Sequence, residues 1–163
     1  MGGELIALAE RLQGLCLGRG LTVAVAESCT GGLVAASITG IAGSSGYFLG
    51  GVVSYSNAAK QAFLDVPQPA LEAHGAVSAQ VAKAMAAGAQ ARFGANLAAS
   101  VTGVSGPDGG SEEKPVGLTY VGLASGAAVD VRRLQLSGDR AGNRDAASRA
   151  ALEWLIEAAE AHR

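Results

Sequence analysis

Apolar positions in the first third of the chain follow a helical pattern and then a strand pattern. Leucines recur at steps of three and four residues over 3–18, and glycines at positions 18 and 20 follow them. This spacing is typical of an amphipathic helix with a glycine stop. The run LTVAVA at 21–26 is almost unbroken, as expected for a strand covered on both faces. An apolar helical run comes next, after the glycines of SCTGG.

Helix and strand patterns continue to alternate through the rest of the chain. The expected elements are a strand over 50–56, a short helix from Asn57 toward Asp65, a helix from Ser78 to Gly94, a strand over 96–103, a glycine-rich loop over 104–117, an antiparallel strand pair over 118–125 and 128–137, and a helix over 144–161 with Asn143 as its cap. This order predicts an α/β fold, a three-layer α/β/α sandwich with a mixed, mostly parallel sheet. We expect one domain spanning 1–163.

Composition and charge narrow the class of protein. The net charge is -2, and no basic cluster is longer than Arg132-Arg133, so we expect no nucleic-acid or anionic-membrane partner. No apolar run reaches the ~20 residues of a membrane span, which favours a cytoplasmic protein. Cys16 and Cys29 lack metal-ligand spacing, so free thiols are expected. The many alanines and glycines favour close helix packing and a homo-oligomer.

Three loops rich in glycine and hydroxyl groups follow predicted strands, and these loops carry the candidate chemistry. They are ESCTGG, SYSN and TGVSGPDGGSEEKPVG. Ligands bind outside the carboxyl ends of parallel strands, so we expect the three loops to meet at one crevice.

Most familiar catalytic motifs are absent. The two histidines, His74 in a polar turn and His162 at the chain end, suit neither a Ser-His-Asp triad nor a zinc site. ESCTGG has no following lysine for a phosphate-binding P-loop, and Tyr55 and Lys60 are one residue too far apart for the Tyr-x-x-x-Lys pair of short-chain dehydrogenases. We therefore expect no metal and no cofactor.

A lysine with hydroxyl groups is the arrangement that remains. Lys60 follows an apolar strand, and a desolvated lysine amine can act as a base. Ser45, in the GSSG stretch at 43–46, would be the nucleophile and the Tyr55 hydroxyl would relay the proton. The alternatives are a plain turn at Ser44-Ser45 and a solvated helix lysine at position 60. The residues alone do not decide between Ser44 and Ser45.

Together these segments resemble one known family. AESCTGG, SYSN followed by a lysine, HGAVS, GPDGGSEEKPVG and LSGDR, in this order, are similar to the CinA C-terminal domain family, whose characterised members are nicotinamide mononucleotide deamidases. The resemblance implies metal-free hydrolysis of nicotinamide mononucleotide to nicotinate mononucleotide and ammonia, in pyridine nucleotide salvage. It also implies a serine-lysine pair assisted by a tyrosine, which corresponds to Ser45, Lys60 and Tyr55. Thr102, at a strand end, is a further catalytic candidate.

The substrate-binding candidates follow from the same loops. A phosphate would bind at the helix start formed by Ser28, Thr30, Gly31 and Gly32. Main-chain N–H groups around Gly43 to Gly46 or at the Thr102-Gly103 turn would stabilise the oxyanion. Arg140 would clamp the phosphate or pair with Asp139 or Asp145, and Glu27 would bind ribose hydroxyls or brace the turn. Asp108, Glu112 and Glu113 would attract the cationic ring, unless their loop packs on a neighbouring subunit. The rival hypotheses are a non-catalytic nucleotide- or protein-binding module and a hydrolase of another amide.

Overall fold

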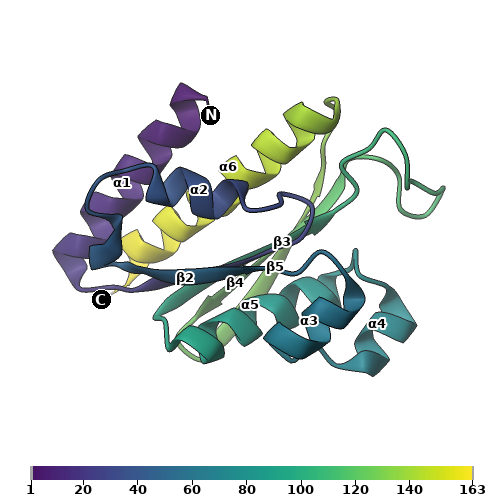
Figure 1. Cartoon of the computed structure of the whole chain (residues 1–163), viewed down its shortest axis with the longest axis horizontal. Helices are drawn as coiled ribbons and strands as arrows, with labels where there is room; N and C mark the ends of the chain where they lie inside the picture. The colour runs from purple at the N-terminus through teal and green to yellow at the C-terminus, as the bar shows by residue number, and fades with distance from the viewer. Residues whose placement is uncertain (1, 163) are drawn as a thin grey trace.

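A five-stranded mixed sheet forms the centre of the molecule (Figure 1). The computed structural model describes residues 2–162. The elements in chain order are α1 (Gly3–Arg19), β1 (Val23–Glu27), α2 (Leu33–Thr39), the 3-10 turn η1 (Ser44–Gly46), β2 (Phe48–Val53), α3 (Asn57–Leu64), α4 (Gln68–His74), α5 (Ala79–Phe93), β3 (Leu97–Gly103), β4 (Leu118–Ser125), β5 (Ala128–Gln135) and α6 (Arg140–Ala161).

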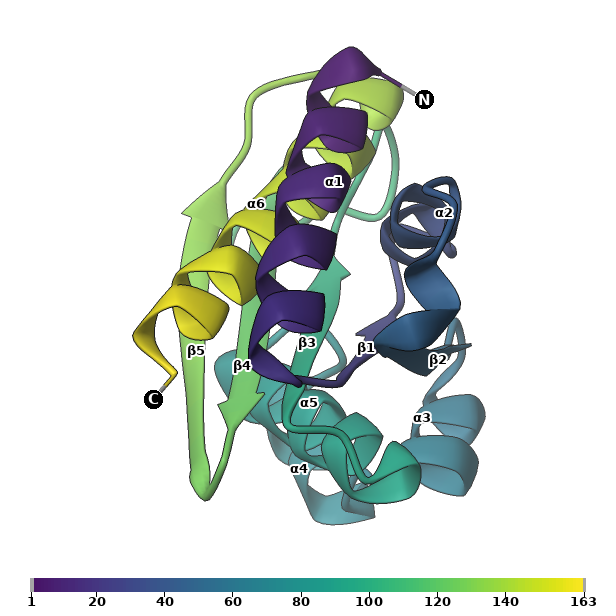
Figure 2. The ribbon, with the colours of Figure 1, turned by 90° about the vertical axis from the view of Figure 1, so that its left-hand side faces the viewer.

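The sheet order is β2-β1-β3-β4-β5. The first three strands are parallel, and β4 and β5 continue the sheet as an antiparallel pair. Helices α1, α2 and α6 cover one face and α3, α4 and α5 the other, as the turned view in Figure 2 shows. A separate hydrophobic core lies on each face. The predicted three-layer α/β/α fold with a mixed sheet is confirmed.

Two helix assignments from the sequence need correction. The elements expected from the sequence include no helix between Asp65 and Ser78, but α4 forms there, with proline at its first positions, where proline is compatible with helical geometry. Helix α6 begins at Arg140, and its cap is Asp139, whose carboxylate accepts the Gly142 N–H at 2.8 Å. Asn143 instead lies inside the helix, where its amide accepts from the Gly138 N–H and donates to the Ser105 carbonyl.

A glycine in α5 sets the position of α3. A Cβ atom at Gly88 would lie far too close to the Leu64 carbonyl at the end of α3, so only glycine permits this approach of the two backbones. The Ser56 hydroxyl caps α3 by accepting the Ala59 N–H at 3.0 Å. Both contacts fix the helix that carries Lys60.

No helix among residues 2–162 combines the length and the hydropathy needed to cross a membrane.

One buried hydroxyl in the core predicts a stabilising substitution. Tyr47 is 1% exposed and its hydroxyl has no hydrogen-bond partner within the described residues, while burial raises its pKa. An unsatisfied buried polar group costs about 1–3 kcal/mol. We therefore expect Tyr47→Phe to raise the free energy of unfolding by about 1 kcal/mol, measured by denaturant titration. Tyr120→Phe, at a half-buried position, is the matched control; a loss of stability in Tyr47→Phe alone would contradict this account.

Candidate active site

A cavity of about 300 Å³ lies at the carboxyl edge of the three parallel strands. The loop after β1 contributes Ser28 and Cys29, the loop after β2 contributes Tyr55, and β3 and its loop contribute residues 102–106, 108 and 109. Lys60 of α3 and Arg140 of α6 complete the polar lining. The three loops that the sequence singled out therefore do meet at one site.

Lys60 is the most unusual side chain of this cavity. It is 1% exposed, and its Nζ donates to the Ser28 hydroxyl at 2.9 Å and to the Ser54 carbonyl at 2.6 Å. Desolvation lowers the pKa of the Lys60 ammonium, with a smaller opposing effect from Cys29. At a given pH a larger fraction of Lys60 is therefore neutral than of a solvated lysine. The lone pair of the neutral amine would face the Ser28 hydroxyl.

Ser28, and not Ser45, is the serine beside Lys60. Ser45 is exposed and lies in η1 before β2, whereas Lys60 follows the other end of that strand. Phe48 pairs with the first residue of β1, and Val53 pairs with the last. A strand rises by about 3.3 Å per residue, so β2 separates Ser45 from Lys60 by roughly 15–20 Å. The expected pairing of Ser45 with Lys60 is therefore wrong within this chain.

The predicted phosphate cradle at the start of α2 is occupied by a side chain of the protein. The Glu27 carboxylate is 1% exposed and accepts from the Thr30 hydroxyl at 2.6 Å, the Val34 N–H at 2.9 Å and the Ala35 N–H at 3.0 Å. It thereby satisfies helix N–H groups that an anion would otherwise use. Glu27 braces the turn, the second of its two expected roles.

Three members of the predicted cradle, Thr30, Gly31 and Gly32, lie outside the cavity as well. Thr30 is fully buried against Glu27, and Gly31 and Gly32 hold positive φ angles of 59° and 103° in the turn. The Arg144 guanidinium, which the sequence did not single out, donates to the Thr30 carbonyl at 3.0 Å. Of the whole SCTGG segment, Ser28 and Cys29 line the cavity.

Four other residues expected at the site do line the cavity: Tyr55, Thr102, Gly103 and Arg140. The buried Thr102 hydroxyl donates to the Ala76 carbonyl at 2.9 Å. Tyr55 is exposed, and its hydroxyl accepts from Arg140 at 3.1 Å. Arg140 also donates to the Gly106 carbonyl at 2.8 Å, and neither expected ion pair, with Asp139 or Asp145, forms in the described chain. These bonds place a cation and a phenol at the cavity mouth.

The acidic loop after β3 contributes less than expected. Asp108 lines the cavity, whereas Glu112 and Glu113 are exposed away from it. The Lys114 ammonium donates to the His74 carbonyl, which ties the loop to α4. Only Asp108 is therefore placed to attract a cationic ring.

Cys29 adds a thiol to the cavity wall. Burial raises its pKa to about 11, against a smaller opposing effect of the Ser105 hydroxyl, so the thiol is neutral near pH 7 and a weak nucleophile. Over residues 2–162, no cluster of three or more His, Cys, Asp or Glu side chains is arranged to hold a metal ion.

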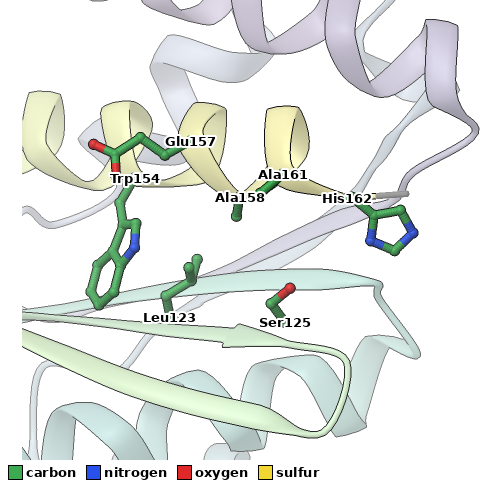
Figure 3. A pocket seen from close by; sticks show the side chains of 7 residues that line it. All are labelled: Leu123, Ser125, Trp154, Glu157, Ala158, Ala161 and His162. Carbon is green, nitrogen blue, oxygen red and sulfur yellow. The ribbon is translucent and has the colours of Figure 1, made fainter.

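A larger cavity, of about 470 Å³, lies between β4 and the end of α6 (Figure 3). Trp154 and Leu123 lie at one end and His162 at the other. The Glu157 carboxylate accepts from Arg132 at 2.7 Å, and the same guanidinium lies 4.1 Å from the Trp154 ring centre. Among the residues that line this cavity, no serine hydroxyl is hydrogen-bonded to a basic side chain. The smaller cavity is therefore the better candidate for catalysis.

Fold and site together define a class: a three-layer α/β protein with a serine-lysine pair at the carboxyl edge of its parallel strands. Residues 5–159 match the model of the CinA C-terminal domain family. The chain belongs to this family.

Individual relatives agree with that assignment. The chain is 53% identical over 146 residues to a CinA-like protein of Citrifermentans bemidjiense, covering 90% of this chain and 35% of the relative. It is 51% identical over 156 residues to a CinA-like protein of Chlorobaculum tepidum, covering 93% of this chain and 37% of that one. The chain thus spans about a third of the length of these curated relatives.

Solved structures share the fold over nearly the whole chain. The competence/damage inducible protein CihA of Agrobacterium tumefaciens superposes with a TM-score of 0.94 at 43% identity, covering 97% of both chains. The competence damage-inducible protein A of Klebsiella pneumoniae gives a TM-score of 0.94 at 31% identity, covering 98% of this chain and 99% of that one.

Proposed function

We propose that this protein hydrolyses the carboxamide of nicotinamide mononucleotide to nicotinate mononucleotide and ammonia, with Ser28 as nucleophile and Lys60 as base. The observation that carries the proposal is the 2.9 Å hydrogen bond between the buried Lys60 Nζ and the Ser28 hydroxyl. Family membership and the amidase activity implied by the sequence resemblance supply the substrate. We place the reaction in cytoplasmic pyridine nucleotide salvage.

In the first step the neutral Lys60 amine accepts the proton of the Ser28 hydroxyl. The Ser28 oxygen attacks the carboxamide carbon, and the pyridinium charge makes that carbon more electrophilic. The carbon-nitrogen bond then breaks, the Lys60 ammonium returns its proton to the departing nitrogen, and ammonia leaves. This sequence of proton transfers needs a lysine that is neutral at working pH, which the burial of Lys60 supports.

In the second step water hydrolyses the ester on Ser28. Lys60 accepts a proton from the water and passes it to the Ser28 oxygen as the ester bond breaks, and the carboxylic acid so formed releases its remaining proton to solvent to give the carboxylate. The developing oxyanion needs preorganised donors. We assign the Cys29 main-chain N–H to this role, because it follows the nucleophile directly and Cys29 lines the cavity.

Tyr55 serves this chemistry from the cavity mouth. Its hydroxyl is held by Arg140, whereas Lys60 bonds directly to Ser28. The direct bond makes a proton relay through Tyr55 unnecessary, so we assign Tyr55 to covering the pyridine ring.

Arg140 is our candidate for recognising the substrate phosphate, since its guanidinium lines the cavity and a planar guanidinium binds phosphate with two parallel bonds. Hydrogen bonds to charged groups contribute about 1.5–3 kcal/mol, so we expect Arg140→Lys to raise the KM for nicotinamide mononucleotide by about tenfold or more. Nicotinamide riboside, which lacks the phosphate, should show little change in kcat/KM. An equal loss with both substrates would contradict phosphate recognition by Arg140.

The test of the function is ammonia release from nicotinamide mononucleotide by purified protein in the presence of a chelator. We expect turnover without added metal. Nucleotide binding without ammonia release would favour the alternative, a non-catalytic binding module. Release from other carboxamides but not from the nucleotide would keep the hydrolase and change its substrate.

A further inference from the structure

The guanidinium of Arg140 is hydrogen-bonded at both of its terminal nitrogens, although the residue is exposed. Its Nη1 donates to the Gly106 carbonyl at 2.8 Å, and its Nη2 donates to the Tyr55 hydroxyl at 3.1 Å. Fixing a long arginine side chain costs rotamer entropy, so these bonds hold it only if the acceptor groups are themselves fixed. Tyr55 is also exposed, which leaves the Gly106 carbonyl as the firmer support.

The position of this guanidinium matters because a further cavity adjoins it. A space of about 500 Å³ lies at the start of α6, lined in part by Pro107 and Val116. Ser105 and Arg140 line both this space and the candidate active-site cavity. An arginine that lost the Gly106 carbonyl would therefore have room to turn away from the candidate active site.

The Asn143 side chain joins the two segments that determine where Arg140 lies. Asn143 is 2% exposed and lies one turn further along α6. Its amide nitrogen donates to the Ser105 carbonyl at 3.0 Å, and the next carbonyl along the chain, that of Gly106, accepts from Arg140. Its amide oxygen accepts from the Gly138 N–H at 2.9 Å, just before α6 begins. One side chain thus fixes the start of the helix and the loop segment that the guanidinium binds.

Helix formation does not explain an asparagine at this position. Asparagine forms helices less readily than alanine, which α6 uses at positions 141, 146 and 147. Burying a polar side chain is costly unless its hydrogen bonds are satisfied. An amide can donate and accept at once, whereas an ionised aspartate only accepts. The chemistry of Asn143 therefore matches its two partners, a carbonyl and an N–H group.

We propose that Asn143 is a positioning residue for Arg140. By holding residues 105–106 against α6, Asn143 keeps the Gly106 carbonyl in place as an acceptor, and the guanidinium stays at the mouth of the candidate active-site cavity. The N–H donors that these bonds leave free are then oriented for a planar, bidentate contact with phosphate. The phosphate contact rests on the proposed function, whereas the positioning rests on the hydrogen bonds of the protein itself.

The first test observes Arg140 without any ligand, by NMR spectroscopy of nitrogen-labelled protein. Hydrogen bonds at both Nη atoms slow the rotation of a guanidinium, so its N–H groups give separate signals. We expect separate Arg140 signals in wild type, identified by their loss in Arg140→Lys, and merged signals in Asn143→Ala. Asn143→Ser, in which the hydroxyl is too short to reach the Ser105 carbonyl, is a second variant with the same expected result.

The matched control is Ser148→Ala, also in α6. Ser148 is fully buried, and its hydroxyl donates to the Arg144 carbonyl at 2.8 Å. This variant removes a buried hydrogen bond of the same helix without touching the loop, so the Arg140 signals should stay separate. Merged signals in wild type, or separate signals in a folded Asn143 variant, would overturn the proposal.

Calorimetric titration then tests the phosphate contact apart from any turnover. In Asn143→Ala we expect the affinity for nicotinate mononucleotide to fall by about tenfold, because a displaced Arg140 loses a charge-assisted bond to the phosphate. The affinity for nicotinate riboside, which lacks the phosphate, should stay within about twofold of wild type. An equal loss with both ligands would contradict an effect through Arg140. Merged Arg140 signals with unchanged nucleotide affinity would support the positioning and remove Arg140 from phosphate recognition.

Discussion

Replacing Ser28 by alanine should abolish turnover of nicotinamide mononucleotide, while replacing Ser45 by alanine should leave kcat/KM within about twofold of wild type. Loss of the nucleophile costs on the order of 10⁶ in a well-studied serine hydrolase, and we expect at least about 10³-fold here. Ser28 bonds to Lys60, whereas Ser45 lies beyond the other end of β2. The measurement is ammonia release under saturating and limiting substrate.

The pair of serine variants also controls for folding. Ser45 is exposed and Ser28 is half-buried, so neither alanine opens a large cavity, and near-wild-type circular dichroism is expected for both. Full activity in Ser28→Ala would remove Ser28 from the chemistry. Loss of activity in Ser45→Ala alone would restore the assignment made from the sequence.

Replacing Lys60 should have the second largest effect. Lys60→Met keeps the length of the side chain and removes the amine, and Lys60→Arg keeps a charge that cannot be released near neutral pH. Both should lower kcat by about 10²-fold or more, the usual contribution of a general base. A Lys60→Arg variant with full activity would exclude Lys60 as the base.

The pH dependence of wild type follows from the same lysine. The active form is the neutral amine, so kcat/KM should rise with pH and level off above the pKa of Lys60. Because burial lowers that pKa from its ordinary value of 10.5, the rise should occur at lower pH than for a solvated lysine. The lowered pKa also means that the folded state binds fewer protons than the unfolded state between the folded pKa of Lys60 and its ordinary value of 10.5. The charged lysine therefore reduces stability at pH values below this window, and the reduction is lost as pH rises through it. A pH-rate profile measured together with unfolding at several pH values checks both signs.

The sequence predicts the layers of this fold because its apolar patterns are local. The unbroken run in β1 and the serine cap of α5 are visible in the chain itself. Helix α4 has proline at its first positions, and α6 begins after the Asp139 cap. Proline and aspartate are also common in turns, so the sequence alone does not show that helices begin at these residues. These elements therefore need the tertiary structure to be placed.

The site was predictable in part for the same reason. Tyr55 and Lys60 follow β2, and Thr102 lies near the end of β3, so all three lie at one edge of the sheet. Ser28 follows β1 directly, whereas Ser45 precedes β2, so the rule that sites lie at the carboxyl ends of parallel strands already favours Ser28. What the chain alone could not give is the partner of each polar group: Glu27 bonds to the start of α2, and this contact excludes a phosphate there.

The most direct test of the central claim is to map the covalent intermediate. Wild-type protein is mixed with nicotinamide mononucleotide, quenched in acid within the first turnover, and digested for mass spectrometry. The account predicts an ester of nicotinate mononucleotide on the peptide that contains Ser28, and none in Lys60→Met. An adduct on any other residue, Ser45 included, would contradict it.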